Sequence, residues 1–390
     1  ISDGVKKLGK RAFAGCDALT SLEIPASVEE MSGAIAACEN LTTISVAPEN
    51  AYYCVQDGVV YSKDGKDLVV YPQIGETSVV VPDGVLSIED YAFACHENLE
   101  HVQLPNGIIN IGNYAFHNCS KLTNVTIPDS ITNIGSGAFE ETALTSLQLP
   151  NGATNLFIRD DAFYGCDKLT SVVIPEGVTS IGARAFYGTG LKNATIPDSV
   201  ADLGQSIFAN CTNLESVTLS GNTPYLNGAF YGCISLKEVN YFGSKDELDK
   251  IAWDEADSNA LKNATVHYFE QWTVETQPTC TIPGYGTSQC TEDGCTKTYT
   301  GEISALGHAW DDGVVNKAAT MTEYGDKTYT CTRCGAQKTQ VLKALYSGTC
   351  GAEGDGSNVT WTLDNAGTLT ISGTGAMYSY WNTGIVGFNT

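Results

Sequence analysis

The amino-acid sequence predicts a solenoid over residues 1–269, mainly β with short helical turns, and three observations support this prediction. A phrase of about 23 residues recurs along this part of the chain, and its clearest copy is LTNVTIPDSITNIGSGAF at 122–139. One position of the phrase is nearly always Phe and recurs every 22 to 24 residues, except for one gap of 58, at Phe13, Ile35, Phe93, Phe116, Phe139, Phe163, Phe186, Phe208 and Phe230. A proline follows each short aliphatic run, at Pro25, Pro48, Pro82, Pro105, Pro128, Pro150, Pro175 and Pro197. Repeats of this length bury their apolar faces against their neighbours.

Each repeat should contain a strand, a second short strand and a turn. The segment before the proline alternates apolar and polar residues, which is typical of a half-buried strand. In one copy Leu99, Val102 and Leu104 should therefore face the core, and the proline ends the strand because it has no N–H to donate. A second run, 131–134, offers another inward pair. Glycines such as Gly135 suit a tight corner, and the Ala-Phe step is expected to close the coil through a short helical turn.

The residue three after the Phe position is usually cysteine, at Cys16, Cys38, Cys119, Cys166, Cys211 and Cys233. One interpretation is a set of disulfides or reactive thiols. The other is a packed interior column, in which a small residue fills a tight turn. Thr142 and Thr189 occupy the same position and cannot form a disulfide, so the packing interpretation is favoured.

Two departures from the regular repeat are expected. Residues of about 49–78 carry two Asp-Gly turn signals, at Asp57 and Asp64, between β-rich runs, which predicts a hairpin bulging out of one coil. Residues 241–269 are predicted to cap the array. Ser244 and Glu247 have the spacing of a capping box, which predicts a helix there, followed by a strand over the last coil.

The composition argues against several functions. The chain has 45 acidic and 21 basic residues, and its formal charge of −24 disfavours binding to nucleic acids. No run approaches the ~18 apolar residues of a membrane span, so no membrane insertion is expected in this fragment. The chain opens at Ile1 in mid-repeat, which suggests that a signal and an anchor lie outside it.

Catalytic motifs are missing from the sequence. It holds no Gly-x-Ser-x-Gly, no phosphate-binding Gly-Lys-Ser/Thr loop and no His-Glu-x-x-His. The segment from His96 to His101 comes nearest, but it falls on a turn and a strand and so lacks the single helical face that a metalloprotease needs. We therefore expect no catalytic residue and no enzyme.

After residue 269 the repeat stops and the composition shifts toward Thr, Gly and Cys. A module at 270–308 aligns with a second module at 309–346, and a partial β-rich segment follows at 347–390. The first module offers three thiols and one imidazole, a donor set that suits structural zinc, at Cys280, Cys290, Cys295 and His308. Zinc would supply on the order of 10–16 kcal/mol, and a disulfide roughly 2–4. In the second module Met321 stands in place of the first cysteine ligand and Ser347 in place of the histidine ligand, so only the Cys331-x-x-Cys334 pair remains. Disulfides and free thiols remain alternatives to zinc.

The phrase Ile-Pro-x-x-Val/Ile-x-x-Ile-Gly-x-x-Ala-Phe-x-x-Cys-x-x-Leu-Thr closely resembles the BspA-like leucine-rich repeats. This resemblance implies a leucine-rich repeat solenoid from a surface or secreted protein of anaerobic, often host-associated, bacteria. It also implies an adhesion or host-protein-binding role for at least some members, without indicating a ligand. The cysteine modules resemble small modules found beside such repeats.

The natural binding face is formed by the outward strand positions, which stacking should align into a ladder. The candidate ligand-binding residues are His101, Gln103, Asn124, Thr126, Ser146, Gln148, Ser171, Asn193, Thr195, Ser216 and Thr218. These small polar side chains suit a protein or glycan of a host or neighbouring cell, although the face lacks the aromatic and Arg cluster of a hot spot. A merely solvated face is the alternative. The sequence thus predicts a non-enzymatic extracellular or cell-surface protein for adhesion or protein binding, or alternatively a spacer or targeting module of a larger secreted hydrolase.

Overall fold

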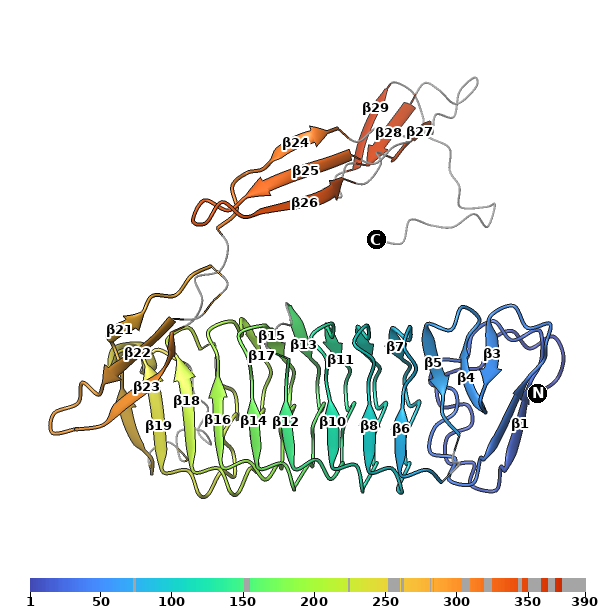
Figure 1. The fold of residues 1–390 in the computed structure, drawn as a ribbon, viewed down its shortest axis with the longest axis horizontal. Coiled ribbons are helices and arrows are strands. Elements are labelled where there is room, and N and C mark those ends of the chain that lie inside the picture. Colours follow the sequence, from blue (N-terminus) through green and yellow to red (C-terminus); the bar gives the residue numbers. More distant parts are fainter. Residues whose placement is uncertain are drawn as a thin grey trace. The chain divides into compact units, whose positions relative to one another are not determined.

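The computed structural model shows a solenoid of stacked coils followed by small antiparallel sheets (Figure 1). The described residues are 1–72, 75–150, 155–223, 225–251, 260, 263–280, 282, 284–303, 309–318, 325–342, 346–349, 359–363 and 369–373. The chain divides into two compact units, one made of residues 1–273 and 286–301 and the other of 274–285 and 302–390. The second cysteine module falls in the second unit, whereas the first module contributes to both.

Each regular coil contributes one strand to each of two parallel rows. The first strand row consists of β1 (Ser21–Ile24), β2 (Thr43–Val46), β6 (Ser78–Val80), β8 (His101–Gln103), β10 (Asn124–Thr126), β12 (Ser146–Gln148), β14 (Ser171–Val173), β16 (Asn193–Ile196), β18 (Ser216–Ser220), β19 (Glu238–Phe242) and β20 (Thr265–Tyr268). The second row contains β7 (Ser87–Ile88), β9 (Asn110–Ile111), β11 (Asn133–Ile134), β13 (Leu156–Ile158), β15 (Val178–Ile181) and β17 (Asp202–Leu203). Strands β8, β10, β12 and β14 each alternate exposed and buried residues, as the sequence predicts.

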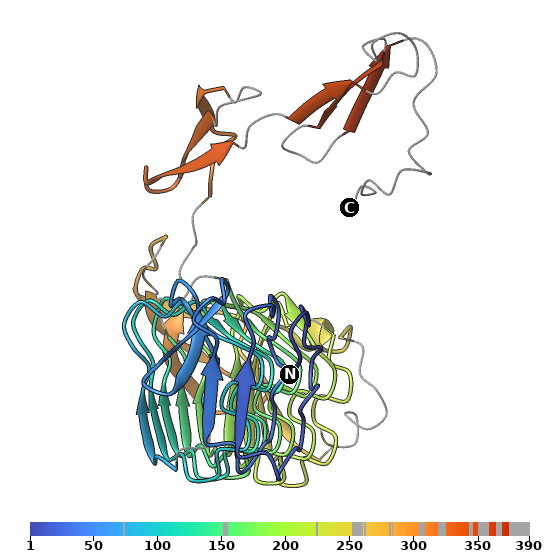
Figure 2. The same cartoon turned by 90° about the vertical axis from the view of Figure 1, so that its right-hand side faces the viewer.

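A column of phenylalanine rings runs through the core of the coils. Figure 2 shows the backbone of these coils from one end of the stack. Neighbouring rings are stacked with centroids 4.9 to 6.2 Å apart from Phe93 to Phe230. All of these rings are fully buried. Each coil therefore completes its apolar core only when the next coil stacks on it, which is how a repeat array gains stability.

At the Phe position the chain forms a series of turns and not the short helical turn that the sequence suggested, and the backbone angles show why. In all nine repeats the residues two before and two after this position have a positive φ; around Phe163 they are Asp161 (φ 58°) and Gly165 (φ 70°). A right-handed helix cannot continue through left-handed residues that stand on both sides of the Phe position, four residues apart. The Phe163 N–H instead donates to the Ala185 carbonyl of the following coil, at 2.8 Å. The turn thus bonds coil to coil, and the array has almost no helix.

The glycines that recur at the corners of the coils are required, but not for the backbone conformation that the sequence suggested. Gly135 does not have a left-handed backbone. A Cβ built on it would lie 2.6 Å from the carbonyl carbon of Gly112 in the preceding coil, and one on Gly182 would lie 2.4 Å from the Asp160 nitrogen. Glycine is required here because successive backbones stack too closely for any side chain.

The inserted segment contains the expected hairpin, but it does not bulge outward. Strands β3 (Tyr53–Gln56) and β4 (Val59–Ser62) are antiparallel, and β5 (Asp67–Val70) returns to pair in parallel with β7. The three strands therefore extend the second row, as Figure 1 shows. The chain then places Tyr71 against Phe93, with ring centroids 4.7 Å apart, so Tyr71 occupies the Phe position missing from the gap of 58. The core divides at this insertion, with the two N-terminal coils forming a cluster of their own.

The cap begins with the predicted capping box. The Ser244 hydroxyl accepts from the Glu247 N–H, the Glu247 carboxylate accepts from the Ser244 N–H at 2.8 Å, and the short helix α1 (Lys245–Leu248) follows. Strand β20 then pairs in parallel with β19. Residues 252–259 of the cap lie outside the described part of the chain.

Three small sheets follow the cap. They are formed by β21 (Trp272–Thr276), β22 (Gly284–Gln289) and β23 (Thr298–Ile303); by β24 (Val314–Lys317), β25 (Gly325–Thr330) and β26 (Gln337–Leu342); and by β27 (Tyr346–Thr349), β28 (Val359–Leu363) and β29 (Leu369–Gly373). No helix among the described residues is long and apolar enough to cross a membrane.

Candidate functional site

Wherever strands of the first row pair, their outward side chains lie in register from one coil to the next. His101 is paired with Asn124, Gln103 with Thr126, and Ser146 with Ser171. Further along, Asn193 pairs with Ser216 and Thr195 with Thr218. Because paired strands lie about 4.8 Å apart, the strands carry two columns of regularly spaced polar groups.

Exposure decides which of the predicted residues could meet a partner. Nine of them are exposed and are here called the ladder face: His101, Gln103, Asn124, Thr126, Ser146, Gln148, Ser171, Asn193 and Thr195. Ser216 is half-buried, and Thr218 is buried, so Thr218 is not available on this face as predicted. The reason is local: the Asn240 amide donates to the Thr218 hydroxyl at 3.4 Å, and Lys297 donates to Glu238 of β19 at 2.7 Å, which brings the 286–301 segment against this end.

The ladder face offers hydrogen bonds rather than charge or apolar area. Its nine residues are amides, hydroxyls and one imidazole. Two exposed valines lie beside them, Val173 on β14 at 63% and Val80 on the neighbouring strand β6 at 65%. No aromatic or Arg residue stands among the nine, so affinity has to come from many small contacts.

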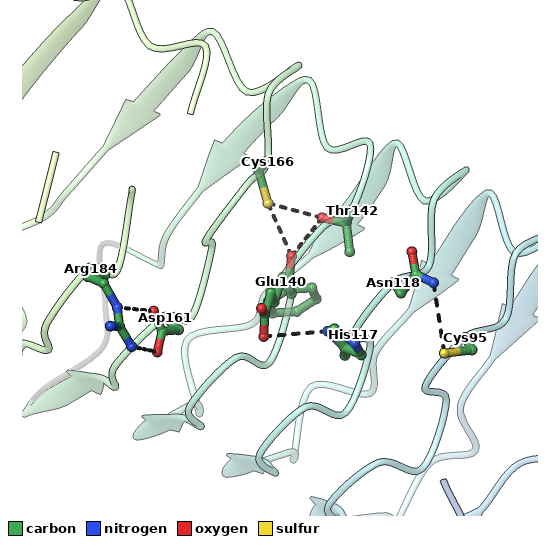
Figure 3. A network of polar contacts seen from close by, with 9 residues as sticks. Cys95, His117, Asn118, Glu140, Thr142, Asp161, Cys166 and Arg184 are labelled. Carbon is green, nitrogen blue, oxygen red and sulfur yellow. Dashed lines mark hydrogen bonds and ion pairs between the residues drawn. The ribbon is translucent and has the colours of Figure 1, made fainter. Parts of the chain in front are cut away.

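The turns at the Phe position carry a second set of polar contacts, drawn in Figure 3. The Arg184 guanidinium forms two 2.7 Å hydrogen bonds with the Asp161 carboxylate in the preceding coil, and this contact raises the pKa of Arg184. His117 and Glu140, again in successive coils, approach to 3.4 Å. These pairs join one coil to the next, and we assign them a structural role.

The cysteine column of the array is a packing and hydrogen-bonding feature. The Cys166 thiol donates to the Phe139 carbonyl of the preceding coil at 3.1 Å, and Thr142 donates to the same oxygen at 3.0 Å. Most cysteines of this column are buried, as the packing interpretation predicts, and no disulfide joins them within the described part of the chain. Burial raises the pKa of Cys166 to about 11, so this sulfur stays protonated at neutral pH and is a poor nucleophile.

Among the described residues, six in the cap and the modules after it form two groups that could hold a metal ion. The cap group is His267, Cys290 and Cys295, and the knuckle group is Cys280, Cys331 and Cys334; within each group the ligand atoms lie within 4.8 Å of one another. In the cap group the His267 Nδ1 lies 3.3 Å from the Cys295 sulfur and 3.8 Å from the Cys290 sulfur. In the knuckle group the Cys280 and Cys331 sulfurs are 3.8 Å apart.

This grouping differs from the set of four predicted from the sequence. Cys280 precedes β22 and Cys290 follows it, and a six-residue strand spans about 20 Å. The two thiols therefore lie at opposite ends of a strand and cannot share an ion, while Cys290 and Cys295 do share a group. The fourth predicted ligand, His308, lies outside the described residues.

Sequence reasoning missed His267, although a signal was present. His267 precedes Cys290 by 23 residues, the same spacing as from His308 to Cys331. The backbone repeats this correspondence, since Thr291 N–H donates to the carbonyl after His267 at 3.0 Å, and Thr332 N–H to the carbonyl after His308 at 2.8 Å. We therefore propose that the first module begins before residue 267, inside the segment assigned to the cap.

The protonation of the groups follows from their surroundings. Partial burial and the Lys297 ammonium lower the pKa of His267, which leaves the ring neutral at neutral pH. Burial and the neighbouring thiols raise the pKa of Cys280 to about 11. A thiol beside an imidazole also occurs in nucleophilic catalysis, but there one thiol suffices. Here a second thiol faces the same nitrogen, which is the arrangement expected of ligands.

Comparison with known proteins places the array in a family. The model of the BspA type leucine rich repeat region matches in six copies, over residues 1–58, 73–157 and 144–259. The chain therefore belongs to the BspA-type leucine-rich repeat family, and its solenoid is a leucine-rich repeat solenoid. It is a repeat protein of a kind that serves protein binding.

Similar solved structures are leucine-rich repeat proteins of bacteria. A leucine-rich repeat protein from Bacteroides ovatus is 30% identical, with a TM-score of 0.41, over 61% of this chain and 59% of that one. A leucine rich cell surface protein from Faecalibacterium prausnitzii is 26% identical, with a TM-score of 0.40, over 65% and 62%. The chain thus spans about three fifths of each of these proteins. No curated protein matches it.

Proposed function

We propose that this chain is a non-enzymatic binding module, extracellular or at a cell surface, whose ladder face binds a protein or glycan of a host or neighbouring cell. The single observation that carries the proposal is the exposure of nine polar side chains on five successive strands of the first row, in register wherever those strands pair. A closed sheet face or one of mixed charge would not offer a partner such a regular surface.

The family and the relatives support an extracellular location. The array belongs to the BspA type leucine rich repeat family, and the Faecalibacterium prausnitzii relative is described as a cell surface protein. The formal charge of −24 disfavours nucleic acids and other polyanions as partners. A neutral or basic protein surface, or a neutral glycan, fits better.

The chemistry of the ladder face indicates how such a partner would bind. Each hydrogen bond contributes only about 0.5–1.5 kcal/mol net, so useful affinity requires several coils to be contacted together. An extended partner with repeating hydroxyl or amide groups meets this requirement because the face repeats at each strand. We therefore expect affinity to rise with the length of the partner.

The test is a binding screen of the 390-residue chain against matrix proteins, mucins and bacterial glycans. Saturable binding should be lost when Thr126→Arg and Ser171→Arg together place two bulky cations on the ladder face. Ala201→Arg, at an exposed position just before β17 in the second row, is the matched control and should bind normally.

Two outcomes would count against the proposal. If the chain binds nothing in the screen, the alternative of a passive spacer or targeting module in a larger secreted hydrolase becomes the better explanation. If a ligand is found but the ladder variant and the control bind it equally, binding takes place on another surface.

A further inference from the structure

We propose that this chain binds two zinc ions, one at the cap group and one at the knuckle group. The inference is independent of the ladder face. It rests on the donor atoms, on their spacing, on the turns that hold them, and on what is buried around them.

The distances between donor atoms match tetrahedral zinc. With Zn–S bonds of about 2.3 Å, two sulfurs on one ion lie about 3.8 Å apart, and the Cys280–Cys331 separation is 3.8 Å. A disulfide would bring these sulfurs to about 2.05 Å. For a sulfur and a nitrogen on one zinc the expected separation is about 3.6 Å. The cap group has 3.3 Å to Cys295 and 3.8 Å to Cys290, on either side of this value.

Tight turns hold the thiols of each group together. In the knuckle group the Gly335 N–H donates to the Cys331 carbonyl at 2.8 Å, and Gly335 has a φ of 74°, so the chain reverses directly after Cys334. In the cap group Gly294 (φ 80°) precedes Cys295, whose N–H donates to the Glu292 carbonyl at 3.0 Å. The loops thus present the sulfurs toward one point without help from an apolar core.

Burial in this region points to the same conclusion. In the first two of the small sheets after the cap and the loops around them, among the residues whose burial the structure describes and apart from glycines, the only buried ones are Cys280, Ser288, Cys290 and Cys331. Strand β24 is exposed along its whole length, and β21 nearly so. Sheets this small cannot be stable on so little apolar burial, and structural zinc supplies folding free energy directly. The cysteines are thus the core of these sheets.

Each site has three protein ligands among the described residues. Structural zinc is almost always bound by four ligands, so the fourth comes from water or from a side chain outside the described part of the chain. The number of zinc ions bound per chain is the same whether the fourth ligand is water or a side chain. The zinc stoichiometry is therefore a direct test.

The experiment measures zinc per chain by elemental analysis of the full-length protein, purified with reductant and without chelator. We expect two zinc ions in the wild type and one in each of two double variants, Cys290→Ser/Cys295→Ser and Cys331→Ser/Cys334→Ser. Cys54→Ser removes a half-exposed thiol that belongs to neither group and should retain two ions. Cobalt in place of zinc should give the absorption bands of a tetrahedral thiolate site.

A second measurement does not depend on variants that may misfold. Removing zinc from the wild type with a chelator should speed proteolysis within the region C-terminal to residue 269 by at least about tenfold. Added zinc should restore the resistance. The far-UV circular dichroism signal of the solenoid should stay unchanged. Well under one zinc in the reduced, zinc-supplied wild type overturns the proposal. So does formation of disulfides within both groups in the purified protein, or a double variant that still binds two ions.

Discussion

The stacked phenylalanine column should stabilise the array by direct coupling between coils, and Phe163 is the place to measure it. Its ring is fully buried and stacked on Phe139 at 5.4 Å and on Phe186 at 5.3 Å, with interplanar angles of 2° and 7°. Phe163→Ala should lower the free energy of unfolding by about 3–5 kcal/mol through lost burial and a cavity. Phe163→Leu retains most of the apolar volume but loses both stacked pairs, each contributing about 0.5–1.5 kcal/mol, so it should cost about 1–3 kcal/mol.

A double-mutant cycle isolates the stacking. Equilibrium urea unfolding of Phe163→Leu, Phe186→Leu and the double variant should give a coupling free energy of about 0.5–1.5 kcal/mol. Phe208 lies one ring further along the column, so the pair Phe163→Leu and Phe208→Leu is the matched control and should be additive within about 0.3–0.5 kcal/mol. If both pairs couple equally, the column contributes through general burial, and the reasoning from ring contacts fails.

Three further substitutions test other parts of the coil. Gly135→Ala would place a Cβ 2.6 Å from the Gly112 carbonyl carbon and should lower the free energy of unfolding in urea by about 1–3 kcal/mol. In the control Gly107→Ala the Cβ would meet only the Leu86 side chain at 3.9 Å, so this variant should be neutral or more stable by up to about 1 kcal/mol. Equal losses of stability in the two variants would disprove the close-approach argument. Burial lowers the pKa of His96 below its ordinary 6.5, so the wild type should lose stability as the pH falls from 7 to 5, and His96→Cys should reduce that loss; an unchanged acid sensitivity would refute this. Burial raises the pKa of Cys166 from 9.0 to about 11, so stability should fall as the pH rises through this range, and Cys166→Thr should remove up to about 3 kcal/mol of the alkaline loss, whereas a variant as alkali-sensitive as the wild type would contradict it.

The regular part of the fold was predictable because its signals are local. Alternation along a strand such as 101–104 and the recurrence of Phe every 22 to 24 residues follow directly from the geometry of one coil. Thr142 in a cysteine position was enough to favour packing over disulfides. These features depend on nothing outside the repeat, so one sequence suffices to find them.

Features that depend on contacts between coils were harder to predict. The Phe turn has the composition of a helical turn, but its N–H groups donate to the next coil, and that requirement imposes positive φ at residues as different as Asp161 and Arg184. Tyr71 takes a Phe position only because the hairpin returns the chain to the sheet. The ligand groups combine residues separated by a strand or a module, such as Cys280 and Cys331, and spacing along the chain does not reveal such pairs.

The ladder face and the cap group are connected through strand register. His267 pairs with Asn240, which pairs with Thr218, and Thr218 pairs with Thr195, so the column of outward side chains runs without a break from the exposed residues to a proposed zinc ligand. Along this column exposure falls from Thr195 to the buried Thr218 and Asn240. The segment carrying Cys290 and Cys295 is tied to β20 by the Thr291 hydrogen bond. A zinc ion joining these cysteines to His267 would therefore hold this segment in place at the strand where the exposed column ends.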